Sequence, residues 1–135
     1  MRSIGSGKRG HGPDELENPA DVAVLPLSGL VAVADRDNHR VCLYDGETGR
    51  FVRCFPGEGR DPITDGLFDG PVALAADGAD HLLVLDGTPR LQVFDGADGT
   101  HLLTRSDLGI EPSSYKGIEW DGLLGRLAIA NGGNA

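Results

Sequence analysis

A glycine-rich run near the start of the chain has the residue types of a phosphate-binding loop. Residues 5–10 (GSGKRG) fit the Gly-x-Gly-x-x-Gly pattern, in which backbone amides at the start of a helix hold a pyrophosphate. That mechanism needs a strand before the loop and a helix after it. Only four residues precede the run, and Gly12-Pro13 opposes a helix, so we interpret the run as a connecting loop.

Two acidic turns offer oxygen atoms to a metal ion. They are residues 35–38 (DRDN) and 95–99 (DGADG). A calcium loop supplies six or more oxygen ligands at regular spacing, whereas His39 stands where a further ligand of the first turn should be. Asp and Asn that bond their own backbone explain both turns better. We therefore expect no cofactor, and calcium or zinc would be expected only if the chain belonged to a metal-dependent enzyme.

The histidines and cysteines form no catalytic or zinc-binding pattern. The sequence contains no His-x-His, no His-Glu-x-x-His, no nucleophile elbow and no zinc-finger spacing. We expect no catalytic residue. Cys42 and Cys54 are expected to be reduced, half-buried thiols, because no export signal is present. A disulfide between them stays open as the alternative, since the loop over 46–50 would place them nearly opposite each other on adjacent strands.

Length and charge limit the classes of function. The chain has 135 residues, the size of one domain, and a formal net charge of -9, which repels nucleic-acid phosphates and anionic lipids. A small basic cluster near the start (Arg2, Lys8, Arg9, His11) is expected to be solvated. No apolar run is long enough to span a membrane, so we expect a soluble, cytoplasmic protein with no membrane partner.

An internal repeat organises the strands. Residues 19–24 (PADVAV) recur at 71–76 (PVALAA), 30–35 recur at 81–86, and 40–46 recur at 90–96, so the offset falls from 52 to 50 residues. A third copy begins at 117. A period of about 50 residues with short apolar runs is typical of a β-propeller, in which each unit is one blade.

Each complete unit is expected to hold four strands in a sequential antiparallel meander. The strands are expected at 20–24, 30–34, 40–44 and 51–55, and again at 72–76, 81–85, 91–94 and 101–104. Their nearly continuous apolar runs indicate that both faces of each sheet are covered, as in stacked blades. We therefore predict one all-β domain over 1–135, a partial β-propeller with blade 1 at about 4–55, blade 2 at about 56–104 and a partial blade 3 at about 105–135.

The first unit resembles an NHL repeat. The matching features are a glycine-rich lead-in, a Pro before the first strand, an Ala-Asp strand end, Asn-x-Arg and a strand that ends in Asp. They stand at Gly5-Ser6-Gly7, Pro19, Ala34-Asp35, Asn38-His39-Arg40 and Tyr44-Asp45. The second unit keeps most of them, but Gly87-Thr88-Pro89 replaces the turn that contains Asn. The resemblance implies that Asp35 with Arg40, and Asp86 with Arg90, tie neighbouring turns of one blade in a structural role.

The resemblance also implies an interaction module, and the acidic charge favours a protein partner. Possible binding loops carry Asp37, Asn38, His39, Tyr115 and Trp120. A propeller closes with four to eight blades, so self-association or further blades are needed to close a ring. Four alternatives stay open: a gluconolactonase-like or peptide-amidating-lyase-like enzyme with an axial metal, an RNA-binding NHL domain, the substrate-recognition part of a RING-linked ubiquitin ligase, and a partial product with no function of its own.

Overall fold

A computed structural model describes residues 5–10, 12–56, 67–87, 90–96, 98–105, 115–121 and 126–131 of the chain. In chain order the elements are β1 (Pro19–Val24), β2 (Leu30–Asp35), a 3-10 turn η1 (Arg36–Asn38), β3 (Arg40–Asp45), β4 (Phe51–Phe55), β5 (Ala73–Ala76), β6 (His81–Leu85), β7 (Leu91–Asp95), β8 (His101–Arg105), β9 (Tyr115–Asp121) and β10 (Arg126–Asn131). No α-helix occurs in these residues, which confirms the all-β class.

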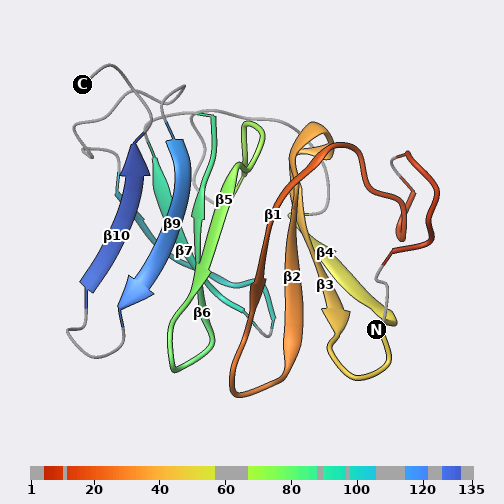
Figure 1. Cartoon of the computed structure of the whole chain (residues 1–135), viewed down its shortest axis with the longest axis horizontal. Helices are drawn as coiled ribbons and strands as arrows, with labels where there is room; N and C mark the ends of the chain where they lie inside the picture. Colours follow the sequence, from red (N-terminus) through yellow and green to blue (C-terminus); the bar gives the residue numbers. More distant parts are fainter. Residues whose placement is uncertain are drawn as a thin grey trace.

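The strands form antiparallel sheets in chain order. Blade 1 has the order β1-β2-β3-β4, blade 2 has the order β5-β6-β7-β8, and β9 pairs with β10. The repeat predicts matching registers, and the structure confirms them: Val33 lies opposite Cys42 in blade 1, and Val84 lies opposite Gln92 in blade 2. Figure 1 shows the three sheets side by side, with β1, β5 and β9 following one another.

Each blade has two apolar faces, because alternate side chains of a strand point to opposite sides of the sheet. We call the faces front and back. The front face of blade 1 carries Val22, Val24, Val31, Val33, Cys42 and Tyr44, and its back face carries Ala23, Ala32, Ala34, Val41, Leu43 and Phe55. The equivalent front face of blade 2 carries Leu74, Ala76, Leu82, Val84, Gln92 and Phe94.

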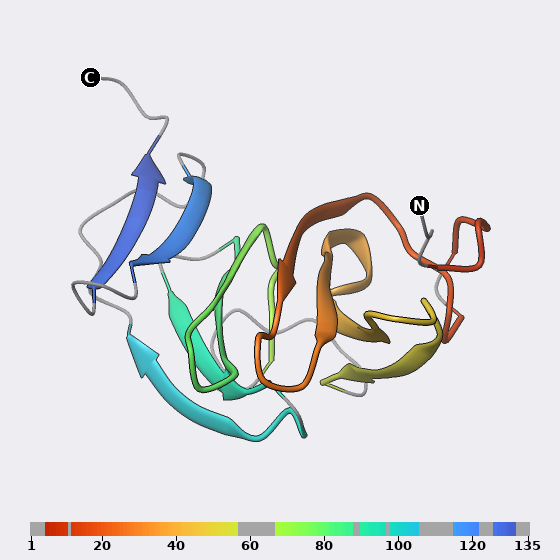
Figure 2. The ribbon, with the colours of Figure 1, turned by 60° about the horizontal axis from the view of Figure 1, so that its bottom comes forward.

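The main core lies between the back face of blade 1 and the front face of blade 2. Three aromatic rings fill its outer part. The ring centroid of Phe94 lies 5.2 Å from that of Phe55 and 5.3 Å from that of Phe68. Such tilted and edge-on contacts add to the stabilisation that burial itself supplies. The view in Figure 2 shows the two sheets as adjacent layers, consistent with blades stacked face to face.

Within the described residues, three side chains accept four backbone hydrogen bonds across the two blades. Asp21 in β1 accepts a hydrogen bond from the amide of Leu74 at 2.9 Å, and His39 Nδ1 accepts one from the amide of Gly70 at 3.0 Å. Asp80, in the turn between β5 and β6, accepts bonds from the amides of Leu27 and Ser28, both at 2.7 Å. These contacts fix the relative position of the two sheets, which the apolar surfaces alone would leave free to slide.

Candidate functional site

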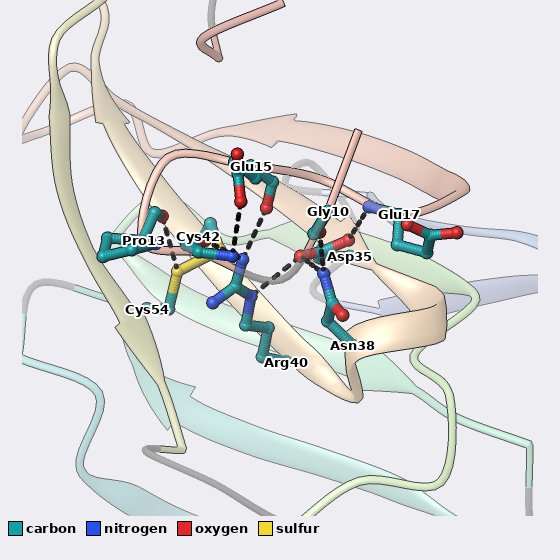
Figure 3. Close-up of polar contacts among 10 residues, drawn as sticks. Gly10, Pro13, Glu15, Glu17, Asp35, Asn38, Arg40, Cys42 and Cys54 are labelled. Atoms are coloured by element: carbon teal, nitrogen blue, oxygen red, sulfur yellow. Dashed lines mark hydrogen bonds and ion pairs between the residues drawn. A yellow bond between two sulfur atoms is a disulfide. The ribbon is translucent and has the colours of Figure 1, made fainter. Parts of the chain in front are cut away.

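The carboxylate of Asp35 and the guanidinium of Arg40 meet at the end of β2 (Figure 3). Arg40 Nε lies 2.8 Å from Asp35 Oδ2, and the Asp35 side chain is fully buried. The same guanidinium donates from Nη2 to the carbonyl oxygens of Gly12 and Glu15, and Asp35 Oδ1 accepts a bond from the amide of Glu17. The pair therefore holds the lead-in segment of blade 1 (residues 5–18) against the turn that follows β2.

Blade 2 repeats this arrangement. Arg90 Nη2 lies 2.7 Å from Asp86 Oδ2 and also donates to the carbonyl oxygen of Leu67. Asp86 accepts a bond from the amide of Asp69 at 3.1 Å. Asp69 and Leu67 stand 52 residues after Glu17 and Glu15, so the same positions are used in both blades. The four residues singled out in the sequence are thus brought together as two equivalent pairs, and we propose that their role is structural.

The turn that carries Asp37, Asn38 and His39 is occupied by contacts within the chain. Asn38 Nδ2 donates to the carbonyl oxygen of Gly10 and to Asp35, and His39 accepts from the amide of Gly70. Asp37 accepts a bond from the amide group of Asn18, and this bond is the main cause that lowers the pKa of its carboxyl. These side chains position the lead-in segment and the next blade, and a binding role for them stays a prediction.

Two further aromatic candidates, Tyr115 and Trp120, stand in β9. Their side chains lie outside the described part of the structure.

The glycine-rich run forms a loop in which Gly5 and Gly7 adopt positive φ values of 86° and 80°. Among the described residues, the first element after this loop is strand β1 and not an α-helix, as expected of a connecting loop.

The cysteines are paired, so the expectation of reduced thiols is wrong for this structure. Cys42 in β3 and Cys54 in β4 lie directly opposite each other in the strand register and form a disulfide. The register explains the pairing, because one residue more or less in the intervening loop would turn the two side chains to opposite faces. The bond joins the two outer strands of blade 1, where blade 2 has Gln92 and Thr104.

Four turns define one end of blades 1 and 2, which we call the turn end. They connect β1 to β2, β3 to β4, β5 to β6 and β7 to β8, and the first and third lie together at the bottom of Figure 1. Leu27 projects here with 74% of its surface exposed. Its amide is fixed by Asp80, as described above. The sequence reasoning missed this residue, and the available signal was a large apolar side chain inside a predicted turn.

Three carboxylates of blade 2 stand in the turns of the turn end: Asp77 and Asp80 between β5 and β6, and Asp98 between β7 and β8. Burial raises the pKa of the Asp80 carboxyl, but the amides of Leu27 and Ser28 lower it by more, so it lies below the ordinary value. For Asp77, burial likewise raises the pKa, and bonds from His81 and the Ala79 amide outweigh that effect. The hydroxyl and amide of Thr100 lower the pKa of Asp98. All three side chains therefore carry negative charge at neutral pH.

Within the described residues, no group of three or more His, Cys, Asp or Glu side chains is arranged to hold a metal ion. Across that same part of the chain, no helix is long and apolar enough to cross a membrane.

Comparisons with known proteins agree with the blade architecture. Residues 16–44 match the family model of the NHL repeat. The RING finger protein nhl-1 of Caenorhabditis elegans is 40% identical over 70 residues, which are 52% of this chain and 7% of that protein. The chain thus spans a small part of this curated relative.

A solved structure shows the same fold. The β-propeller domain of Cps50 (Swd1) from Myceliophteria thermophila superposes with a TM-score of 0.59 at 15% identity, and the match covers 97% of this chain and 34% of that one. At this identity the likeness concerns the fold alone. Together with the stacked four-stranded sheets, these matches show that residues 16–44 carry an NHL repeat and that the described strands have the fold of a partial β-propeller.

Proposed function

We propose that the chain is a protein-binding module that recognises its partner through the turn end of blades 1 and 2. The observation that carries this proposal is the placement of Leu27. Leu27 is 74% exposed, and it stands on a turn whose backbone amides donate two hydrogen bonds to the buried Asp80. Because the backbone of this turn is already held in place, the turn loses less conformational entropy on binding than a mobile loop would.

The charge around Leu27 defines the kind of partner. Asp77 and Asp98 lie on neighbouring turns, and Glu47 is exposed on the turn between β3 and β4. With a net charge of -9 for the whole chain, this surface favours Lys or Arg side chains and repels phosphates. We therefore propose a protein segment with an apolar side chain flanked by basic residues as the partner, in preference to RNA.

Affinity capture with matched variants tests this proposal. The tagged chain, its Leu27→Ser variant and its Leu102→Ser variant are used to capture proteins from cells, and the captured proteins are quantified by mass spectrometry. Leu102 is 49% exposed and lies within strand β8 rather than in a turn, so it serves as the control. The captured partner is then titrated directly. The Leu27→Ser substitution should raise the Kd for this partner by roughly 30-fold, because about 2 kcal/mol of apolar burial is lost.

Two outcomes would contradict the proposal. Equal binding of the partner by the Leu27→Ser and Leu102→Ser variants would remove Leu27 from the interface. Loss of all captured material after treatment with ribonuclease would point to RNA instead. A genuine basic partner should also bind more weakly as the salt concentration rises, because the carboxylates of the turn end are screened.

The similarity to a RING finger protein favours a second candidate, the substrate-recognition part of a RING-linked ubiquitin ligase. Its ligase chemistry would belong to other domains. If this candidate is right, fusion of the chain to a RING domain should increase ubiquitination of the captured partner. The same fusion with the Leu27→Ser substitution should not increase it.

A further inference from the structure

The disulfide of blade 1 joins a buried sulfur atom to an accessible one. Cys42 in β3 has no exposed surface, whereas Cys54 is half-buried on β4, and its neighbours Val52 and Arg53 are exposed. Strand β4 is the last strand of its sheet and pairs with β3 on one side. A thiolate in solution can therefore approach the Sγ atom of Cys54, and Cys42 is then the sulfur that leaves.

The Sγ atom of Cys54 also lies beside the lead-in segment. It stands 3.8 Å from the carbonyl oxygen of Pro13 (Figure 3). A disulfide sulfur carries no hydrogen, so this contact is not a hydrogen bond in the oxidised chain. A thiol has one hydrogen to donate, and the sulfur lies within reach of a weak S–H···O bond to this oxygen. Reduction thus removes a cross-link and creates a donor that faces the lead-in segment.

Blade 2 folds without a cross-link at the equivalent positions. Gln92 and Thr104 lie opposite each other there, in the places of the two cysteines. Gln92 is buried and donates from Nε2 to the carbonyl oxygen of Leu67 at 2.8 Å, and Leu67 corresponds to Glu15 of the lead-in segment. A side-chain donor on the two outer strands therefore binds the segment before β5. The reduced form of blade 1 can use the same arrangement, with a thiol as the donor.

We propose that Cys42 and Cys54 form a redox-sensitive switch between two folded states of blade 1. In the oxidised state, the disulfide locks β4 to β3. In the reduced state, β4 is free of the cross-link, and the Cys54 thiol donates to the Pro13 carbonyl and holds the lead-in segment more firmly. This switch is independent of the binding surface proposed for the turn end.

The electrons come from a thiol reductant, either one dithiol or two molecules of glutathione. A reductant thiolate attacks Cys54 Sγ and forms a mixed disulfide, while the bond to Cys42 breaks and the Cys42 thiolate takes up a proton. A second reductant thiolate attacks the reductant sulfur of the mixed disulfide and releases the Cys54 thiolate, which is protonated in turn. The protein gains two electrons, and the reductant becomes a disulfide. Glutathione disulfide reverses the sequence.

Thiol trapping tests whether the disulfide opens in the folded chain. The full chain is equilibrated without denaturant in buffers with a rising ratio of reduced to oxidised glutathione. Free thiols are then trapped with a maleimide and counted by mass spectrometry. We expect two thiols to appear together and to disappear again when glutathione disulfide is restored, whereas structural disulfides resist glutathione. A disulfide that opens only after denaturant is added would overturn the proposal.

Hydrogen exchange distinguishes the switch from the simple loss of a cross-link. Reduction should speed amide exchange in β4 by about tenfold or more, because its cross-link is gone. In the same sample, exchange over residues 12–16 should slow by about twofold to fivefold, the size expected of a weak S–H···O bond. Faster exchange in both segments, or unchanged exchange over residues 12–16, would overturn the proposal.

Two matched variants, both kept under reducing conditions, test the role of the Cys54 thiol. Cys42→Ala removes the disulfide and keeps this thiol, so residues 12–16 should exchange as slowly as in the reduced wild-type chain. Cys54→Ala removes the disulfide and the donor together, so residues 12–16 should exchange at least as fast as in the oxidised wild-type chain. Equal exchange over residues 12–16 in the two variants would overturn the proposal.

Discussion

Replacement of Asp80 by glycine should separate the two blades at the turn end. Its carboxylate is 7% exposed and accepts two backbone amides of blade 1 at 2.7 Å. Hydrogen bonds to a charged group contribute about 1.5–3 kcal/mol each when both partners are buried. Leu27 and Ser28 are exposed, so water replaces part of the loss. We expect the Asp80→Gly variant to lose about 2 kcal/mol in free energy of unfolding, because glycine keeps the positive φ without strain.

Thermal unfolding followed by circular dichroism measures this loss. For a domain of this size, about 2 kcal/mol lowers the Tm by roughly 6–10 °C. The control is Asp98→Gly, which removes an exposed carboxylate that bonds the amide of Thr100 in its own turn. Equal Tm values for the two variants would refute the assignment of Asp80 as a contact between blades.

The contribution of Asp80 should also depend on pH. Its folded-state pKa lies below the ordinary value of 3.8, so the stabilisation is present above that value and is lost as the pH falls through the folded-state pKa. The gap in Tm between the wild-type chain and the Asp80→Gly variant should therefore narrow below about pH 3.8. A gap that stays constant on acidification would show that the carboxylate charge does not contribute.

Three further variants test other contacts. Arg40→Lys removes the forked donor that binds Asp35 and two carbonyl oxygens of the lead-in segment, and it should cost about 1–2 kcal/mol and speed hydrogen exchange over residues 12–17. Phe94→Ala empties the centre of the aromatic cluster and should cost about 3–5 kcal/mol in denaturant unfolding, with both blades affected. Cys42→Ser with Cys54→Ser removes a cross-link of 12 residues and should cost about 3 kcal/mol, whereas a reducing agent should not change the Tm of that variant.

The strand order and the registers could be predicted from the sequence, because the same pattern of apolar runs and turns occurs in two successive units. Once Pro19 was aligned with Pro71 and Arg40 with Arg90, the pairing within each blade followed from the alternation of apolar positions. The pairs Asp35 with Arg40 and Asp86 with Arg90 were implied by the resemblance to NHL repeats, and the structure places each pair within hydrogen-bonding distance. Their attachment to the lead-in segments could not be predicted. Every residue has a backbone carbonyl, so the sequence does not show which carbonyls the arginines bind.

Contacts between blades were the least predictable part. In the sequence, Asp80 cannot be distinguished from other Asp residues that form turns. Only the packing of the two sheets brings its carboxylate to the amides of Leu27 and Ser28. The loop length placed Cys42 and Cys54 nearly opposite each other on adjacent strands, but their oxidation state could not be predicted from that spacing, and the structure has them as a disulfide. Leu27 was missed because exposure depends on tertiary packing, and a leucine in a turn is as often covered as exposed.

A nuclear Overhauser spectrum of the aromatic rings tests most directly that blades 1 and 2 are stacked face to face, an arrangement on which the proposed binding surface at the turn end depends. The packing predicts cross-peaks from the ring of Phe94 to the rings of Phe55 and Phe68, at centroid distances of 5.2 and 5.3 Å. Cross-peaks from Phe94 only to residues of its own sheet, such as His101, would contradict the stacking and with it the proposed binding surface.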